Sequence, residues 1–303
     1  MSTDRSPNAN RTRIAATMGK ARILSEAMPY IRRFAGAVVV IKYGGSAMVD
    51  PDLQESFAAD VTLLSLVGLK PVVVHGGGPQ ISAAMERAGI EPEWVDGLRV
   101  TDAATIDVVQ EVLAGTVNPS IVKNLVGHGA RAIGMTGIDG GLITAEARDP
   151  RLGFVGKVSA VDTELVGGLL DQGVVPVIAP IARGADGEVY NLNADTAAAA
   201  IARNLGAQKL IYLTDVEGIY ADPSDAKTLL SRLTLDEARD LVPTMAGGML
   251  PKVESCIAAL EGGVAQAHIL DGRVQHSILL EVFTPEGIGT MLVPADWEPV
   301  HGG

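Results

Sequence analysis

The stretch VVVIKYGGS at residues 38–46 decides the fold class, because it joins a buried strand to a glycine loop. Its four leading apolar residues, followed closely by glycine, favour a strand. The strand ends on Lys42, and Gly44 and Gly45 allow the backbone to approach a ligand closely and to offer its N–H groups. An ammonium beside such a loop suits phosphoryl oxygens, whereas the alternative is a surface lysine before an ordinary turn.

The overall composition narrows the class of protein. The chain has 303 residues, of which 47% are hydrophobic and 35 are glycine, as expected for a globular α/β protein with one large domain or two lobes. A net charge of −12 argues against a nucleic-acid partner, which requires a basic surface. The single cysteine, Cys256, excludes an internal disulfide and a thiolate metal site. We see neither a membrane-spanning run nor a secretory signal, so we expect a cytoplasmic protein with no membrane partner.

The first 33 residues differ from the rest in charge, with seven basic residues against two acidic ones. We expect residues 1–12 to be disordered. Apolar residues recur at helical spacing from Ile14 to Phe34, which predicts a helix that Pro29 kinks or divides. The apolar face of this helix must be covered, either by its own domain or by a neighbouring subunit. A transit peptide is a third interpretation.

Helix and strand patterns alternate along the main domain, residues 36–303, which follows an N-terminal segment of residues 1–35. The predicted strands are 37–42, 71–75, 131–135, 174–178 and 208–213. The predicted helices are 52–67, 79–88, 102–113, 119–128, 163–172, 194–205, 235–242 and 249–262. Hairpin strands are expected within 141–161, and three further strands within 265–293. This alternation predicts an α/β fold with a mostly parallel sheet covered by helices on both faces.

A second glycine loop, His75-Gly-Gly-Gly-Pro79, follows the strand predicted at 71–75 and leads into a helix. This order suits an anion, because free N–H groups and the helix dipole point the same way. The loop is not the dinucleotide fingerprint, whose third glycine is replaced here by Ile81, and the sequence contains no Walker A loop. The alternative is a tight turn that needs positive φ, although three consecutive glycines exceed that need.

Charged side chains follow other predicted strands. Arg99 either binds a carboxylate through two hydrogen bonds or lies on the surface. Asn193 and Asp195 precede an alanine-rich helix and are either N-caps or functional groups, and Asp195 lies beyond the cap position. Lys252 lies in the first turn of a helix, where the dipole disfavours a lysine, so we expect a compensating anion.

Lys42, Lys252, Asp195 and the glycine loops together form the inventory that phosphoryl transfer requires. In that reaction the protein positions donor and acceptor and neutralises the charge that builds on the transferred group. Two ammoniums would flank that group, and Asp195 would orient them and reduce their repulsion.

Six motifs, in their order and spacing, resemble the amino-acid kinase superfamily and, within it, the acetylglutamate kinases. The motifs are KYGG at 42–45, HGGGP at 75–79, GLRVT at 97–101, NLNAD at 191–195, TDVEG at 214–218 and GGMLPK at 247–252. The resemblance implies a three-layer αβα sandwich around a mostly parallel central sheet. It also implies transfer of the ATP γ-phosphoryl group to the side-chain carboxylate of N-acetyl-L-glutamate, the second step of arginine synthesis.

The resemblance also implies roles for individual residues. Lys42 and Lys252 would stabilise the transition state, Asp195 would organise them, and Gly44 and Gly45 would contact the transferring phosphate. The substrate would be held by Gly77, Gly78, Arg99, Asn191 and Asn193. The ATP site would comprise Asp215, Val216, Glu217, Gly218, Ile219, Tyr220, Met245, Gly247 and Gly248. Mg²⁺ would be carried on the ATP phosphates rather than in a protein cage. An N-lobe of about 36–190 would bind the acylated amino acid and form dimers, and a C-lobe of about 191–303 would bind ATP.

The N-terminal helix resembles the extension of arginine-inhibited members, which interlaces dimers into a hexamer. By this resemblance L-arginine would be an inhibitor bound by Tyr30, His268, Glu281 and Gly287. From the residues alone, the carboxylate of Glu281 suits a guanidinium, but an exposed glutamate at the end of a strand is the usual interpretation.

Several other functions remain open on the sequence. Within the fold the rivals are glutamate 5-kinase, aspartokinase, carbamate kinase and uridylate kinase. A nicotinamide dehydrogenase would need the missing third glycine. A catalytically silent arginine sensor would not need the intact set of Lys42, Asp195 and Lys252.

Overall fold

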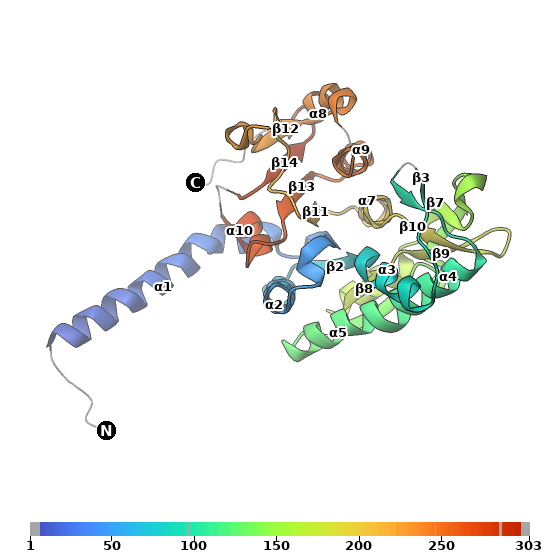
Figure 1. Cartoon of the computed structure of the whole chain (residues 1–303). Coiled ribbons are helices and arrows are strands. Elements are labelled where there is room, and N and C mark those ends of the chain that lie inside the picture. The colour runs from blue at the N-terminus through green and yellow to red at the C-terminus, as the bar shows by residue number, and fades with distance from the viewer. Residues whose placement is uncertain (1–6, 96, 223, 246, 285–286, 298–303) are drawn as a thin grey trace.

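An eight-stranded sheet forms the centre of the main domain in the computed structural model. The structure describes residues 7–95, 97–222, 224–245, 247–284 and 287–297 (Figure 1). The strand order is β12-β14-β13-β11-β1-β2-β8-β5. The six strands from β13 to β5 are parallel, and β14 is antiparallel to β13. The bounds are β1 Val38–Tyr43, β2 Lys70–His75, β5 Ala132–Thr136, β8 Val175–Ala179, β11 Lys209–Thr214, β12 Arg232–Thr234, β13 Gln266–Asp271 and β14 Thr290–Val293.

The central strands contribute to two cores, one on each face of the sheet. In β1, Val39 and Ile41 pack into one core, whereas Val40 packs into the other, and all three side chains are fully buried. Successive side chains of a strand point to opposite faces. A strand covered on both faces can therefore be apolar at every position, which explains the unbroken run Val38–Ile41.

Helices cover both faces of this sheet. The core that contains Val40 also includes side chains from α6 Glu164–Asp171, α7 Ala194–Asn204, α8 Leu235–Leu241 and α9 Met249–Glu261. The other core includes side chains from α2 Pro51–Leu66, α3 Gly78–Arg87, α4 Ala103–Gln110, α5 Asn118–Gly127 and α10 Ser277–Phe283. The predicted α/β fold class, a three-layer αβα sandwich around a mostly parallel sheet, is confirmed.

A small closed barrel and a short hairpin add to the N-terminal half. The barrel contains β6 Ile143–Ala147, β7 Val155–Val161, β9 Ile181–Gly184 and β10 Val189–Leu192, and the hairpin contains β3 Trp94–Val95 and β4 Leu98–Arg99. The hairpin predicted within 141–161 matches β6 and β7. The sequence analysis missed β9 and β10, because each is four residues long and the turn between them contains charged residues and glycine.

Helix α1, Pro7–Phe34, projects away from the body of the molecule (Figure 1). The prediction of disorder was wrong for residues 7–12, which are helical, and residues 1–6 lie outside the described part. Pro29 does not divide the helix, since a proline removes a single backbone donor and the helix ends one turn later. Met18, Ile23, Leu24 and Met28 are all more than half exposed. Neither α1 nor any other described helix combines the length and apolar character that crossing a membrane requires.

The prediction of three strands within 265–293 was wrong for the middle element, which is α10. A short apolar run such as Ile278-Leu-Leu-Glu-Val-Phe283 is compatible with either a strand or a helix segment. In the helix, Ile278 and Val282 lie one turn apart and are both buried. The helices predicted at 102–113 and 119–128 are α4 and α5, joined by a π-helix, Glu111–Val117, into one continuous stretch.

His276 links α10 to α2. It precedes α10 with φ of 58°, and among the described residues no other non-glycine residue has a positive φ. The Nδ1 of its ring lies 2.6 Å from Oδ1 of Asp60 on α2, and its backbone N–H donates to Ser56 Oγ at 2.7 Å. Burial raises the pKa of Asp60, although the hydrogen bond and charge of His276 oppose this shift. The link therefore satisfies a carboxylate that is almost completely inaccessible to solvent.

We predict that His276→Gly destabilises the fold by about 1–3 kcal/mol, because Asp60 loses its side-chain partner while glycine accepts the positive φ freely. Urea unfolding at pH 7 measures the change. The matched control is His128→Ala. His128 Nε2 lies 3.2 Å from Oε2 of Glu55, which is largely exposed, so the loss of this contact should cost about 0–1 kcal/mol of stability. A stabilised His276→Gly protein would mean that backbone strain outweighs the hydrogen bond.

Candidate active site

A buried carboxylate joins two lysines from distant parts of the chain. Lys42 Nζ lies 3.1 Å from Asp195 Oδ1, and Lys252 Nζ lies 3.1 Å from Asp195 Oδ2. Lys42 is on β1, Asp195 is in the first turn of α7, and Lys252 is in the first turn of α9. The structure thus brings together the three residues predicted to be catalytic.

The local sequence fixes Asp195 in place. Asn193 is the N-cap of α7, and its Oδ1 accepts the N–H groups of Asp195 at 2.8 Å and Thr196 at 3.0 Å. Burial alone would raise the pKa of Asp195, but the charges of Lys42 and Lys252 outweigh burial and lower it. Asp195 is therefore an ionised counter-ion near neutral pH and not a proton donor. The cap uses the amide oxygen of Asn193 and leaves its amide N–H groups for a ligand.

Larger residues in the loop after β1 would push against charged side chains of the site. A Cβ on Gly44 would lie 2.5 Å from the Lys42 ammonium, and a Cβ on Gly45 would lie 2.5 Å from Asp215 Oδ1. Gly45 also has φ of 71°, which favours glycine. The Ser46 N–H donates to Asp215 Oδ1 at 2.7 Å, so Asp215 at the end of β11 holds this loop. The predicted phosphate-binding glycines therefore lie between the lysine pair and the residues predicted to bind ATP.

The second glycine loop is shaped by His75. Its Nδ1–H donates to the Gly76 carbonyl at 2.7 Å, while its Nε2 accepts from Asn118 Nδ2 at 3.1 Å. Burial lowers the pKa of His75 to about 4, so the ring is neutral at pH 7. None of Gly76, Gly77 and Gly78 has φ in the left-handed range, and Gly77 has φ of 168° with ψ of 20°. A left-handed turn is therefore not the reason for the glycines, which leaves close approach.

Gly77 is confined on its protein side, where an added Cβ would collide with Leu113 on the π-helix. Gly78 begins α3 and has open space at its Cβ position. The N-terminus of α3 therefore remains accessible to a ligand, as the strand–glycine–helix pattern predicted.

Arg99 is buried although it has no acidic partner among the described residues. Its side chain donates to Ser82 Oγ at 2.7 Å, to Met85 Sδ at 3.2 Å and to the Gly78 carbonyl at 3.4 Å. The Trp94 ring covers one face of the guanidinium, with its centroid 4.5 Å from Cζ. Burial lowers the pKa of Arg99, and a carboxylate would offset the burial of its charge.

A cleft of about 720 Å³ lies beside the lysine pair. It is bounded by α7, α9, the β6–β7 hairpin and the turn of the β3–β4 hairpin, and its lining includes Gly97, Asn193, Gly247 and Gly248. Lys42, Asp195 and Lys252 do not line it. The cleft thus shares residues with the predicted substrate and nucleotide sites without containing the charged centre itself.

The residues predicted to bind ATP follow β11 and precede α9. Tyr220 donates to Glu217 Oε2 at 2.7 Å, and the Ile219 N–H donates to Thr290 Oγ1 at 2.8 Å. Val216 N–H donates to Thr214 Oγ1 at 3.1 Å. Met245 and Gly247 lie just before α9, and Gly248 is its N-cap.

Among the predicted substrate residues, Asn191 is half-buried on β10, next to the cap residue Asn193.

A second buried charged cluster surrounds Glu281, which is on α10 and not at a strand end. Glu281 Oε1 lies 2.7 Å from His268 Nδ1, and its Oε2 accepts the Ile288 N–H at 2.8 Å. Lys209 donates to His268 Nε2 at 3.2 Å and its Nζ lies 4.8 Å from the Phe34 ring centroid. Of the predicted arginine-site residues, His268, Glu281 and Gly287 therefore lie together, whereas Tyr30 lies half-buried on α1, which contacts α10.

Burial and the neighbouring hydrogen bonds and charges together set the protonation of this cluster. Burial and the charge of Lys209 lower the pKa of His268 to about 4. Burial alone would raise the pKa of Glu281, but its hydrogen bond to His268 is the largest of the opposing effects and the pKa falls to about 2. Burial lowers the pKa of Lys209 to about 8. The sequence analysis missed Lys209, whose available signal was a lysine at the start of a strongly apolar strand.

The described side chains contain no group of three or more His, Cys, Asp and Glu residues that could hold a metal ion. Arg273, which the sequence analysis did not assign, pairs with Asp271 at 2.8 Å at the end of β13.

The sequence profile of the amino acid kinase family matches residues 37–271. The chain belongs to this family. It is 53% identical to the acetylglutamate kinase of Acidothermus cellulolyticus, over 93% of this chain and 99% of that protein. It is 52% identical to the acetylglutamate kinase of Symbiobacterium thermophilum, over 91% of this chain and 98% of that protein. The predicted resemblance to acetylglutamate kinases is confirmed, and the chain is accordingly an enzyme of the kinase type.

Solved structures share the fold. An N-acetylglutamate synthase from Neisseria gonorrhoeae, complexed with coenzyme A and N-acetyl-glutamate, has a TM-score of 0.81 and 31% identity, over 93% of this chain and 66% of that chain. A carbamate kinase from Giardia lamblia bound to AMP-PNP has a TM-score of 0.63 and 18% identity, over 86% of this chain and 99% of that chain. At that identity the carbamate kinase supports the fold alone.

We predict that Lys42→Ala and Lys252→Ala each lower kcat by about 10²-fold or more, because each removes a positive charge aimed at the centre of the kinase site. Steady-state turnover of ATP measures the loss. Lys227→Ala is the matched control, since Lys227 is exposed on a short 3₁₀ helix, and it keeps the parental rate. Unaltered turnover in either variant would remove that lysine from the mechanism.

Proposed function

We propose that the enzyme transfers the γ-phosphoryl group of ATP to the side-chain carboxylate of N-acetyl-L-glutamate. The product is N-acetyl-L-glutamyl 5-phosphate, an acyl phosphate of arginine biosynthesis. The relatives with half of their residues identical to this chain are named acetylglutamate kinases, which supports this choice of acceptor. The observation that carries the proposal is the placement of Lys42 and Lys252 on either oxygen of the buried Asp195.

The chemistry needs little from the protein beyond charge and position. A carboxylate acceptor is already ionised at neutral pH, so the reaction needs no general base. Its oxygen attacks the γ-phosphorus as the bond to the ADP oxygen breaks, and negative charge spreads over the phosphoryl oxygens. In this proposal Lys42 and Lys252 stabilise that charge, Asp195 holds both ammoniums, and the Gly44 and Gly45 loop contacts the phosphate.

The acceptor and the nucleotide would approach from opposite sides of the lysine pair. Arg99 would bind the α-carboxylate of N-acetyl-L-glutamate, since it is a buried cation without an acidic partner among the described residues. Gly77, Gly78, Asn191 and Asn193 would hold the rest of the acceptor. The loop after β11 and the segment before α9 would surround ATP, whose phosphates would carry Mg²⁺.

The acceptor is tested by measuring ATP consumption with N-acetyl-L-glutamate, L-glutamate, L-aspartate, carbamate and UMP in parallel. We expect turnover with N-acetyl-L-glutamate to exceed turnover with each of the others by at least about 10²-fold, since a site that binds the polar groups of one substrate rejects analogues that lack them. Trapping of the acyl phosphate with hydroxylamine identifies the product. Preferred use of another acceptor would overturn the assignment.

We also propose that L-arginine inhibits the enzyme at the cluster of His268, Glu281 and Gly287, with Tyr30 contributing from α1. Glu281 is an ionised carboxylate in a buried setting, and such a group suits a guanidinium. Gly287 lies against Glu281, because an added Cβ would lie 2.9 Å from its Oε2. A related N-acetylglutamate synthase, 29% identical, has been solved with L-arginine bound, which is consistent with such a site in this fold.

The proposed oligomer is a hexamer built as a trimer of dimers through α1. The support is physical: Met18, Ile23, Leu24 and Met28 are exposed on a helix that extends away from the body of its own domain (Figure 1). Burial of such side chains is worth about 1.5–3 kcal/mol each. The α1 helix of a neighbouring copy carries the same apolar side chains and could therefore cover them.

We predict that deletion of residues 1–33 abolishes both the hexamer and the inhibition by L-arginine, because α1 supplies the subunit contact and one wall of the arginine site. Light scattering and the dependence of turnover on arginine concentration measure the two effects. Unchanged oligomer size together with unchanged inhibition would contradict the proposal.

A second variant separates the arginine site from assembly. Glu281→Gln keeps the size of the side chain and removes its charge, so we expect at least a tenfold weaker inhibition by arginine with the hexamer intact. The control is Glu261→Gln, a surface residue paired with Arg239, which leaves inhibition unchanged.

A further inference from the structure

We propose that Trp94 is a positioning residue that holds the guanidinium of Arg99 in place for the substrate carboxylate. This inference deepens the proposed function, since it concerns how that site recognises one carboxylate of its substrate. It also gives a role to an exposed tryptophan that the sequence analysis did not single out.

The β3–β4 hairpin is built around this pair of residues. Trp94 and Arg99 are directly opposite each other across the two short strands. The ring centroid of Trp94 lies 4.5 Å from Cζ of Arg99, within the distance of a cation–π contact. Each strand of the hairpin has two residues, so the stacked pair of Trp94 and Arg99 is a large part of the side-chain contact between the strands.

The contact uses the face of the guanidinium and leaves the N–H groups on its edge for hydrogen-bond acceptors. Arginine has five N–H groups in one plane. On that edge, Ser82 Oγ and the Gly78 carbonyl accept from one terminal nitrogen, and the Met85 thioether, a weak acceptor, lies against the other. Further N–H groups are therefore available, and the stacked ring fixes the plane in which a carboxylate would have to approach.

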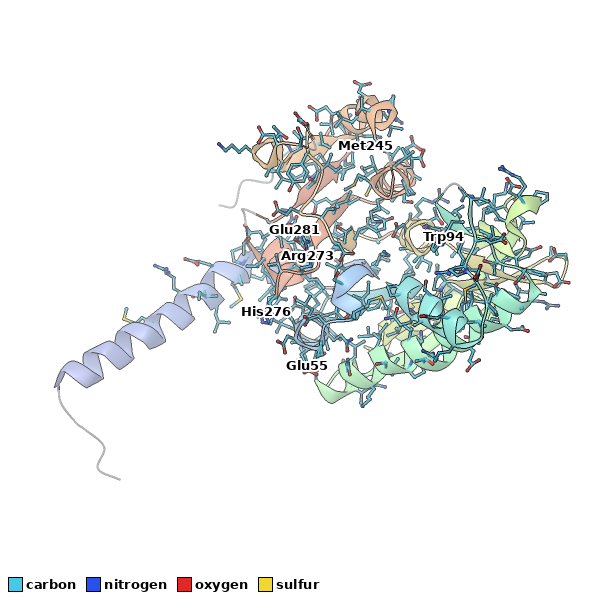
Figure 2. The ribbon with its side chains drawn as sticks, viewed as in Figure 1. Glu55, Trp94, Met245, Arg273, His276 and Glu281 are labelled. Carbon is cyan, nitrogen blue, oxygen red and sulfur yellow. The ribbon has the colours of Figure 1, made fainter. Side chains whose placement is uncertain are left out.

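The exposure of the two residues fits a covering role rather than a core role. Arg99 is 7% exposed, whereas the Trp94 that covers it, labelled in Figure 2, is 56% exposed. A tryptophan needed for the stability of the hydrophobic core would be buried among apolar side chains. Trp94 instead keeps water from one face of a cation, which strengthens the interaction of that cation with an anion.

The hairpin also borders the cleft beside the lysine pair. Gly97 and Leu98, which lie between Trp94 and Arg99, are in the lining of the 720 Å³ cleft. Arg99 itself is not in this lining, and its guanidinium contacts Ser82 and Met85 on α3, so a ligand in the cleft would meet the hairpin at its turn. Loss of the stacked ring would leave Arg99 more mobile.

The test compares Trp94→Phe and Trp94→Leu with the parent enzyme. Leucine keeps apolar contact and lacks a π-face, whereas phenylalanine retains a weaker one. We expect KM for N-acetyl-L-glutamate to rise in the order parent, Phe, Leu, by about three- to thirtyfold for Leu. We expect kcat, KM for ATP and the melting temperature to stay close to the parental values, because the ring is exposed, belongs to neither hydrophobic core, and its loss leaves Lys42, Asp195 and Lys252 unchanged.

A substrate analogue separates a positioning role from a general structural one. 4-Acetamidobutyrate keeps the acetamide and the reacting carboxylate of N-acetyl-L-glutamate but lacks the carboxylate assigned to Arg99. As a competitive inhibitor it should bind the parent and Trp94→Leu equally well. The control variant is Trp297→Phe, which alters another tryptophan stacked on an arginine, Arg232, and should change neither constant.

The outcomes are distinct. An unchanged KM for N-acetyl-L-glutamate in Trp94→Leu, or an equal weakening of N-acetyl-L-glutamate and 4-acetamidobutyrate, would overturn the role of Trp94. A parent enzyme that does not phosphorylate N-acetyl-L-glutamate would instead overturn the proposed function. The first result leaves the kinase assignment standing, so the two failures are distinguishable.

Discussion

The pairing of one buried carboxylate with two ammoniums is the constraint on which the site depends. Asp195 is 4% exposed, and each of its oxygens lies 3.1 Å from a lysine nitrogen. An isolated charge at this depth would destabilise the fold by several kcal/mol. Removing one member of a buried charge cluster costs more stability than replacing all of its members with apolar residues. The triad of Lys42, Asp195 and Lys252 therefore fixes the end of β1 and the first turns of α7 and α9 relative to one another.

The triad also explains the helix termini that form it. A carboxylate in the first turn of α7 is favoured by the helix dipole, whereas Lys252 in the first turn of α9 is disfavoured. The sequence analysis inferred a compensating anion for Lys252, and Asp195 is such an anion. Two positive charges share one negative charge, so the centre retains an excess positive charge that suits a further anion.

The sequence was most informative where one physical rule dominated. The alternation of helix and strand patterns predicted a sheet covered on both faces, which Val39, Val40 and Ile41 bear out by packing into two cores. Paired glycines marked the loops. It was least informative where local pattern is ambiguous. Ser277–Phe283 has a composition that suits either a strand or a helix, and only packing against α2 and α1 decides for the helix. Lys209 gave little signal, because its burial depends on Gln266 and His268, which are more than 50 residues away.

The two charged clusters lie toward opposite ends of the same strands, which constrains any regulation. Lys209 begins β11, whereas Lys42 on β1 pairs with Tyr212, three residues farther along β11 and roughly 10 Å away. Every residue of β11 is buried, and a packed strand does not bend continuously. Contacts outside the strand do connect the two regions: Glu281 lies on α10, His276 at its start binds Asp60 on α2, and α2 follows the loop that contains Gly45. The proposed inhibition by arginine would therefore act by moving α10 against α2 as rigid bodies, and not by deforming the sheet between them.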